Sequence, residues 1–289
     1  MFEILEDTIL DTIKLIPFLF ITYLIMEYIE NKTSNKTKET IKKSGRFGPL
    51  IGGIVGIFPQ CGFSVSATNL YAARVISMGT LIAVYLSTSD EMLPIFMSKF
   101  LETDFLETSL IVKILLVKLF VAIICGFIVD FIFRAINKEN NSEEEIKNIC
   151  EHEHCHCHEE GVLKSSIKHT LNITIYILIT TLIINIVIHL IGEETIEEFL
   201  TNNLILGPII SSLIGLIPNC AASVIITNLY VEKVINGACL ISGLLTGAGV
   251  GLIVLFRVNK NIKENLKIMS IVYFVGVIAG IVLQGLHLM

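Results

Sequence analysis

The chain has no tryptophan, only six prolines in 289 residues, and little charge. Lys, Arg, Asp and Glu together make up 17% of the residues, whereas a soluble globular domain carries about 25%. Hydrophobic residues make up 53%, and the mean hydropathy is +0.75. This composition excludes an ordinary water-soluble domain. The net charge of −6 says little by itself, and nucleic acid is not expected as a partner.

Motifs for nucleotide binding are also missing. No glycine-rich loop ends in Lys-Ser or Lys-Thr, as a phosphate-binding loop would. Any transport would therefore be secondary, driven by an ion gradient with H⁺ as one possible coupling ion, or would depend on a separate partner. Neither enzyme activity nor a cofactor is expected. The N-terminal residues MFEILED are acidic where a signal peptide would be basic, so no cleavable signal peptide is expected.

Long apolar runs are what the chain has in abundance. Several reach the roughly 20 residues that a helix needs to cross a bilayer core of about 30 Å. The sequence therefore predicts an all-α polytopic protein of the cell membrane, with the lipid bilayer as its surroundings.

One stretch occurs twice without a gap, at residues 48–76 and 207–235. Both copies contain a Gly-Pro start, a Pro-X-Cys tripeptide and a Thr-Asn-Leu-Tyr block, all in register. Self-similarity of this kind indicates an architecture built from repeats. We expect two transmembrane repeats, at 1–135 and 161–289, joined by a cytoplasmic linker at 136–160.

The charges of the loops predict how the two repeats are oriented. The loops at 30–46 and 257–267 are rich in Lys and Arg and should be cytoplasmic, whereas the acidic loop at 192–203 should be external. The N-terminus would then be external, and the two repeated stretches would enter the membrane from opposite sides. Inverted repeats of this kind are typical of secondary transporters.

Each repeated stretch is too short to span twice. Residues 48–58 would make a helix of about 16 Å, about half of a bilayer core. We interpret each stretch as a Pro-broken re-entrant helical hairpin with its tip at 59–62 or 218–221. The alternative is a pair of ordinary kinked helices with small-residue packing faces. With three full spans in each half, including an apolar run at about 237–256, the chain has about ten helical segments.

The two tips are the candidate substrate site. If they meet, two thiols would favour arsenite or soft metals, amide and carboxylate oxygens would favour manganese, and half-helix N-termini could hold an anion. The cysteines could instead be small buried apolar residues. The asparagines in the second arm could brace the hairpin and not touch substrate. The candidate substrate-binding residues are Gln60, Cys61, Ser64, Asn219, Cys220, Ser223, Asn69 and Asn228.

Two adjacent carboxylates, Asp90 and Glu91, are the candidates for ion coupling. They align with Gly249 and Val250 of the second repeat, so only one half carries acid here. Acidic groups in or beside a span are costly unless they serve an ion or a proton. The alternative is that the pair is solvated at the external interface. Of the two, we expect Asp90 to matter more.

The linker contains the sequence CEHEHCHCH at 150–158. Alternating Cys and His suits zinc, copper(I) or thiophilic metalloids, although the spacing is not that of a zinc finger. We predict that this loop binds metal outside the translocation path; the alternative is a disordered polar linker. The candidate ligands are Cys150, His152, His154, Cys155, His156, Cys157 and His158.

Several of these motifs resemble those of the ten-transmembrane heavy-metal exporter family, whose members are described as arsenic efflux proteins or manganese transporters. The matching motifs are PQCGFS at 59–64, LSTSDEMLP at 86–94, GLIPNCAAS at 215–223 and LFRVNK at 255–260, together with the Cys/His-rich loop. The resemblance implies export of a toxic metal or metalloid. A transporter of another solute, such as an organic anion, with the loop only regulatory, and a membrane-embedded enzyme or metal sensor are the alternatives.

Overall fold

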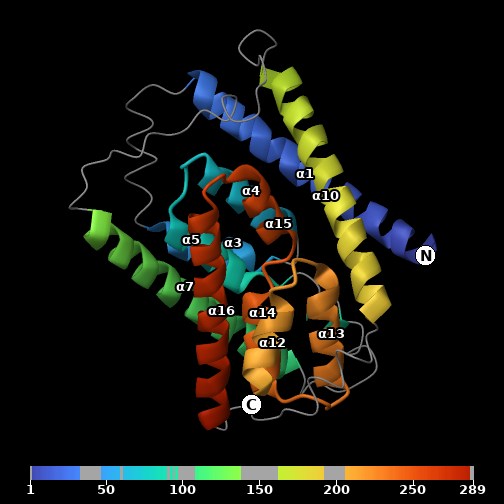
Figure 1. Ribbon diagram of the computed structural model, residues 1–289. Coiled ribbons are helices and arrows are strands. Elements are labelled where there is room, and N and C mark those ends of the chain that lie inside the picture. The colour runs from blue at the N-terminus through green and yellow to red at the C-terminus, as the bar shows by residue number, and fades with distance from the viewer. Residues whose placement is uncertain are drawn as a thin grey trace.

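The computed structural model in Figure 1 is built from helices in every part that it describes. It describes residues 2–32, 47–58, 61–89, 92–93, 95–96, 108–137, 162–191 and 206–286. The helices of the first half are α1 (Phe2–Lys32), α3 (Gly48–Gly56), α4 (Cys61–Ala72), α5 (Met78–Ser87) and α7 (Thr108–Asn137). Those of the second half are α10 (Val162–Ile191), α12 (Gly207–Gly215), α13 (Cys220–Val231), α14 (Gly237–Thr246), α15 (Val250–Val258) and α16 (Ile262–Gly285).

The sequence repeat is also a repeat of helices. Helices α12, α13 and α14 begin and end at the residues that align with the ends of α3, α4 and α5. The turn after the second helix is repeated as well, because Arg74 and Lys233 both have a φ of 61°. The same local sequence signals therefore fold in the same way in both halves.

Matching caps define the ends of these helices. Pro49 and Pro208 lie in the first turn of α3 and α12. The missing N–H of proline costs no hydrogen bond there, because amides in the first turn have no partner within the helix. Ser77 caps α5 by accepting from the amide of Thr80, and Asn236 caps α14 by accepting from the amide of Cys239. These caps satisfy amides that would otherwise be left unpaired inside an apolar bundle.

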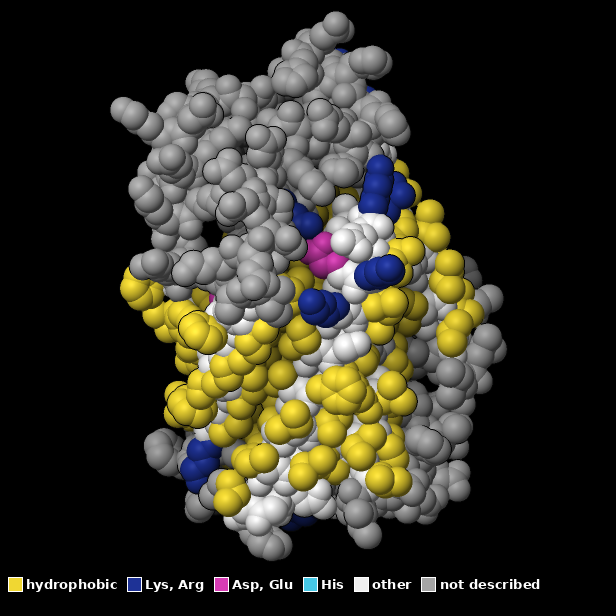
Figure 2. Space-filling view, turned by 60° about the vertical axis from the view of Figure 1, so that its left-hand side comes forward, with side chains coloured by type: hydrophobic (Ala, Val, Ile, Leu, Met, Phe, Trp, Pro, Cys, Tyr) yellow, Lys and Arg dark blue, Asp and Glu magenta, His cyan; other side chains and the backbone are white. Residues whose placement is uncertain are grey.

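The long helices have one apolar face turned outward. On α7 the buried residues Ile114, Lys118 and Ala122 follow helical spacing, while Leu116 and Phe120 on the other face are exposed. Hydrophobic side chains form a broad band in Figure 2, and Lys and Arg lie toward its ends. Among the described residues, four helical segments are long and apolar enough to cross a membrane: 110–133, 166–187, 237–258 and 262–285. These findings confirm an all-α polytopic membrane protein.

The segment at 237–258 lies at the centre of the bundle, with 89% of its most apolar window buried. The sequence predicted an uninterrupted run here, but the structure divides it into α14 and α15, with a break at 247–249. Gly249 has φ 55° and ψ −143°, a conformation that residues with a Cβ rarely adopt. Gly249 therefore allows the backbone to break the helix at this point.

Small residues allow the interior helices to approach closely. A Cβ on Gly79 of α5 would lie 2.1 Å from the carbonyl oxygen of Gly126 on α7. On α16, a Cβ on Gly280 would lie 2.7 Å from the side chains of Pro208 and Ser242. Glycine at such crossings lets two backbones pack without a side chain between them.

The arms of each repeated stretch pack mainly against other helices. In the first half, α3 packs on α5 and α7, while α4 packs on α15 and α1. In the second half, α12 packs on α14 and α16, while α13 packs mainly on α14. Because α4 packs on α15, the first half of the chain contacts the central broken helix of the second half.

Several sequence predictions concern residues outside those described. These are Gln60, the carboxylates Asp90 and Glu91, and all seven candidate ligands of the Cys/His loop. The membrane orientation of the repeats and the re-entry of the hairpins also remain predictions.

Candidate functional site

The first residues of α4 and α13 lie against each other. The sulfur of Cys61 is 3.3 Å from that of Cys220, although the two residues are 159 positions apart in the chain. A disulfide bond would require about 2.05 Å, so these are two free thiols in contact. The structure therefore brings together the cysteines that end the two Pro-X-Cys tripeptides.

The same hydrogen bonds follow each cysteine. Ser64 donates to the carbonyl oxygen of Cys61 at 2.8 Å, and Ser223 donates to that of Cys220 at 2.8 Å. One turn later, Thr68 donates to the carbonyl oxygen of Ser64 at 2.7 Å. Each hydroxyl is thus held close to its cysteine by the first turn of the helix.

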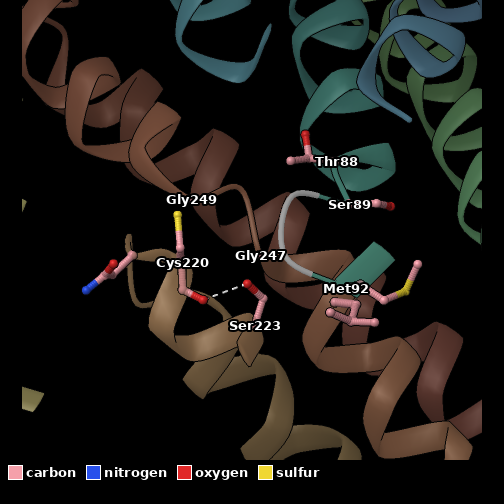
Figure 3. Close-up of a pocket in the computed structure, with 9 residues that line it drawn as sticks. Thr88, Ser89, Met92, Cys220, Ser223, Gly247 and Gly249 are labelled. Atoms are coloured by element: carbon pink, nitrogen blue, oxygen red, sulfur yellow. Dashed lines mark hydrogen bonds between the residues drawn. The ribbon is translucent and has the colours of Figure 1, made fainter. Parts of the chain in front are cut away.

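A pocket opens beside Cys220, between α13 and the ends of two helices. Figure 3 shows Cys220 and Ser223 on one side of it, Thr88, Ser89 and Met92 on the other, and Gly247 of the α14–α15 break between them. The full lining is Thr88, Ser89, Met92, Asn219, Cys220, Ser223, Leu244, Gly247 and Gly249. Because α5 ends at Ser87 and α14 ends at Thr246, the pocket lies where a helix ends in each half.

Asn219 connects this pocket to the outer helices. Its side-chain oxygen accepts from the amide of Ala221, which caps α13. Its side-chain amide donates to the oxygen of Asn185 on α10, and Asn185 donates to the hydroxyl of Thr8 on α1 at 2.8 Å. Sequence reasoning missed Asn185, although an asparagine within an apolar run of this length was a usable signal.

The two asparagines further along the arms lie away from the pocket lining. Asn69 is buried; its side chain accepts from the hydroxyl of Tyr23 at 3.2 Å and donates to the carbonyl oxygen of Val65 at 3.2 Å. Asn228 is half-buried, and it is not among the described residues that line the pocket. The contacts of Asn69 fit the bracing role considered for it.

A buried lysine lies next to the pocket and was not singled out by the sequence analysis. Lys118 of α7 has no exposed surface, and its ammonium donates to the carbonyl oxygens of Thr88 and Leu244, two residues of the lining. A lysine inside an apolar run of 24 residues is itself a signal of function.

The described residues offer a soft ligand set. Cys61 and Cys220 supply two thiols, with serine hydroxyls one turn away. Across the described ranges, no group of three or more His, Cys, Asp or Glu is placed to hold a metal ion. Two thiols in contact are ligands of the kind that soft metals and metalloids prefer.

Comparison with known proteins identifies the family. The chain matches the family described as "Putative, 10TM heavy-metal exporter" over residues 2–191 and 158–288. No curated protein and no solved structure matches the chain. This is a family of membrane transporters, not of enzymes, and the resemblance seen in the sequence motifs is confirmed. Because the two matches cover nearly the whole chain, the protein belongs to this family of ten-transmembrane heavy-metal exporters.

Proposed function

We propose that the protein is a secondary exporter of a thiophilic metal or metalloid, which passes through a site shared by Cys61 and Cys220. The observation that carries this proposal is the 3.3 Å contact between the two sulfurs, one from each repeat. A site formed at the junction of two repeats is where secondary transporters of this architecture bind their substrates.

The sulfur separation favours a metalloid such as arsenite. With metal–sulfur bonds near 2.3 Å, a tetrahedral ion would hold two sulfurs about 3.8 Å apart. A pyramidal centre with bond angles near 90° would hold them about 3.3 Å apart at the same bond length. The observed separation is close to the second value, so a pyramidal metalloid would need little movement of the two helices.

The mechanism that we propose is alternating access by two inverted repeats. Two features support it. The helices of the two repeats begin and end at aligned residues, and a helix in each half ends at the pocket. Breaks in transporter helices free backbone groups that line a substrate path. The charges of the loops give the orientation, with the N-terminus external and the 257–267 loop cytoplasmic.

Two further parts of the proposal come from the sequence. Asp90, with Glu91 beside it, would couple export to an ion, with H⁺ as the candidate. The Cys/His loop would capture metal on the cytoplasmic side without forming part of the path. Replacing Cys150, Cys155 and Cys157 with serine should weaken metal binding while leaving some transport.

The test is a set of serine substitutions scored by resistance. Cells expressing the protein are grown on arsenite, manganese and soft metals, and uptake into inverted vesicles is measured. Cys61→Ser and Cys220→Ser should each abolish arsenite export. Cys125→Ser, in α7, is the matched control because Cys125 is also a half-buried cysteine outside any disulfide but is not part of the contact between Cys61 and Cys220.

Two outcomes would contradict this proposal. If the serine variants export normally while Gln60→Ala or Asn219→Ala does not, the site uses oxygen ligands and manganese is the better substrate. If none of these four changes affects the transport of any metal, the shared site is wrong.

A further inference from the structure

Helix α7 places a lysine ammonium deep inside the bundle. Lys118 is fully buried and lies about 5 Å along the helix axis from the middle of the span at 110–133. It is too far from either end for its ammonium to reach water by snorkelling outward along the helix surface. Its position requires partners inside the protein.

The ammonium finds partners at the ends of two helices. It donates to the carbonyl oxygen of Thr88, the residue that caps the C-terminus of α5. It also donates to the carbonyl oxygen of Leu244, in the last turn of α14, at 2.9 Å. Lys118 therefore joins a helix end of the first repeat to a helix end of the second.

The backbone at the α14 end leaves this carbonyl available. The amide of Ala248, which would bond to Leu244 if the helix continued, bonds instead to the carbonyl oxygen of Thr246 at 2.8 Å. Carbonyls at a helix C-terminus carry partial negative charge. Two such ends pointing at one place form a site for a cation, and in transporters with broken helices such ends coordinate ions from solution.

We propose that the ammonium of Lys118 is a tethered cation that fills the site formed by the C-terminal ends of α5 and α14. It takes the place that Na⁺ or another small cation would otherwise occupy. The two helix ends that border the pocket are then held together without any cation from solution. Lys118 is thus a positioning residue, and it acts on the pocket through Thr88 and Leu244.

The first experiment measures cation binding and needs no transported substrate. In the purified full-length Lys118→Ala protein, ethylammonium chloride should raise the Tm by about 2–4 °C relative to choline chloride at equal ionic strength. Wild type should show no such difference, because the site is already filled. Lys113→Ala is the matched control, since Lys113 is exposed on the same helix. Equal Tm values for Lys118→Ala in the two salts would overturn the proposal.

The second experiment uses transport and a variant that keeps the volume of the side chain. Lys118→Met should remain folded, as judged by size-exclusion chromatography, but lose transport at least tenfold, while Lys118→Arg should retain most of it. Ethylammonium should restore transport in Lys118→Ala but not in Lys118→Met, whose side chain fills the space. Normal transport by Lys118→Met would overturn the proposal, even if Lys118→Ala cannot be purified.

The role of Lys118 in transport rests on the proposed function, but the two can fail separately. If the protein exports no metalloid, ethylammonium should still raise the Tm of Lys118→Ala. If export depends on the cysteines but ethylammonium does not raise the Tm of Lys118→Ala, only the proposed role of Lys118 is wrong. Wild-type export should also be the same in sodium and choline buffers.

Discussion

The contact between Cys61 and Cys220 allows a test of geometry that does not depend on transport. Two thiols 3.3 Å apart can bind one arsenic atom together, whereas a single thiol binds arsenic weakly and reversibly. The α4 and α13 helices both begin at these cysteines, so the thiols approach along two helix N-termini. If the proposed function is right, the pair would chelate arsenic only while both helices are in place.

Phenylarsine oxide, a reagent for paired thiols, should protect both cysteines from alkylation. In the purified protein with the three loop cysteines replaced by serine, one equivalent should slow maleimide labelling of Cys61 and Cys220 at least tenfold, measured by peptide mass spectrometry. Labelling of Cys125 should be unchanged, and Cys61→Ser should remove the protection of Cys220. Equal protection of Cys220 in wild type and in Cys61→Ser would show that the two thiols do not bind arsenic together.

Among the elements, the break between α14 and α15 forms part of the pocket wall. Gly247 and Gly249 both line it, and Gly249 adopts a backbone conformation that only glycine takes readily. Buried backbone groups next to the break are satisfied within the protein, as Lys118 shows at Leu244. The break is thus a stable feature of the described fold, and not a distortion of a continuous helix.

Gly249→Ala should destabilise the protein and impair export. Forcing a Cβ into φ 55° and ψ −143° costs on the order of 1–3 kcal/mol, which should lower the Tm by several degrees. Gly285→Ala near the end of α16 is the control, because its Cβ would meet nothing within 4 Å. A Tm for Gly249→Ala equal to that of Gly285→Ala would contradict this account of the break.

The sequence predicted where the helices of each repeated stretch are interrupted, between α3 and α4 and between α12 and α13, but missed the central break. The Gly-Pro pairs at the start of α3 and α12, and the prolines two residues before α4 and α13, are visible in the sequence itself. The α14–α15 region gave no such signal, because glycine is common in membrane helices and the run at 237–256 is apolar throughout. Lys118 and Asn185 were missed for another reason: their places within apolar runs were a usable signal, but only the packing shows which partners they contact.

At the scale of the whole molecule, an ion pair ties the two halves together. Arg74, just after α4, makes two hydrogen bonds to the carboxylate of Glu264 in the first turn of α16, at 2.8 and 3.1 Å. The hydroxyl of Tyr71 donates to the same carboxylate. The side chains of Arg74 and Glu264 are only 16% and 12% exposed, so solvent screens this pair less than a surface pair.

Breaking this pair should loosen the contact between the halves. Glu264→Ala should lower the free energy of unfolding by about 1–3 kcal/mol, because the guanidinium of Arg74 would lose its buried anionic partner. The charge swap Arg74→Glu with Glu264→Arg should recover part of the loss. Neutralising the exposed Lys263 on the same helix is the control and should change the Tm little. A double-mutant cycle with no coupling between Arg74 and Glu264 would show that the pair contributes nothing.

The proposed inverted arrangement of the repeats predicts the side of the membrane on which each loop lies. Single cysteines introduced in a cysteine-free background report the side through an impermeant maleimide. A cysteine at Glu197, in the acidic loop at 192–203, should react in intact cells. A cysteine at Lys260, exposed in the basic loop at 257–267, should react only after the cells are opened.

Two labelling results would contradict this arrangement. If both positions react from the same side, the span between them does not cross as expected. If Glu197 reacts only from inside, the repeats are not inverted. In either case the two cysteines could still meet, but alternating access by inverted repeats would no longer explain how a metalloid bound between them leaves the cell.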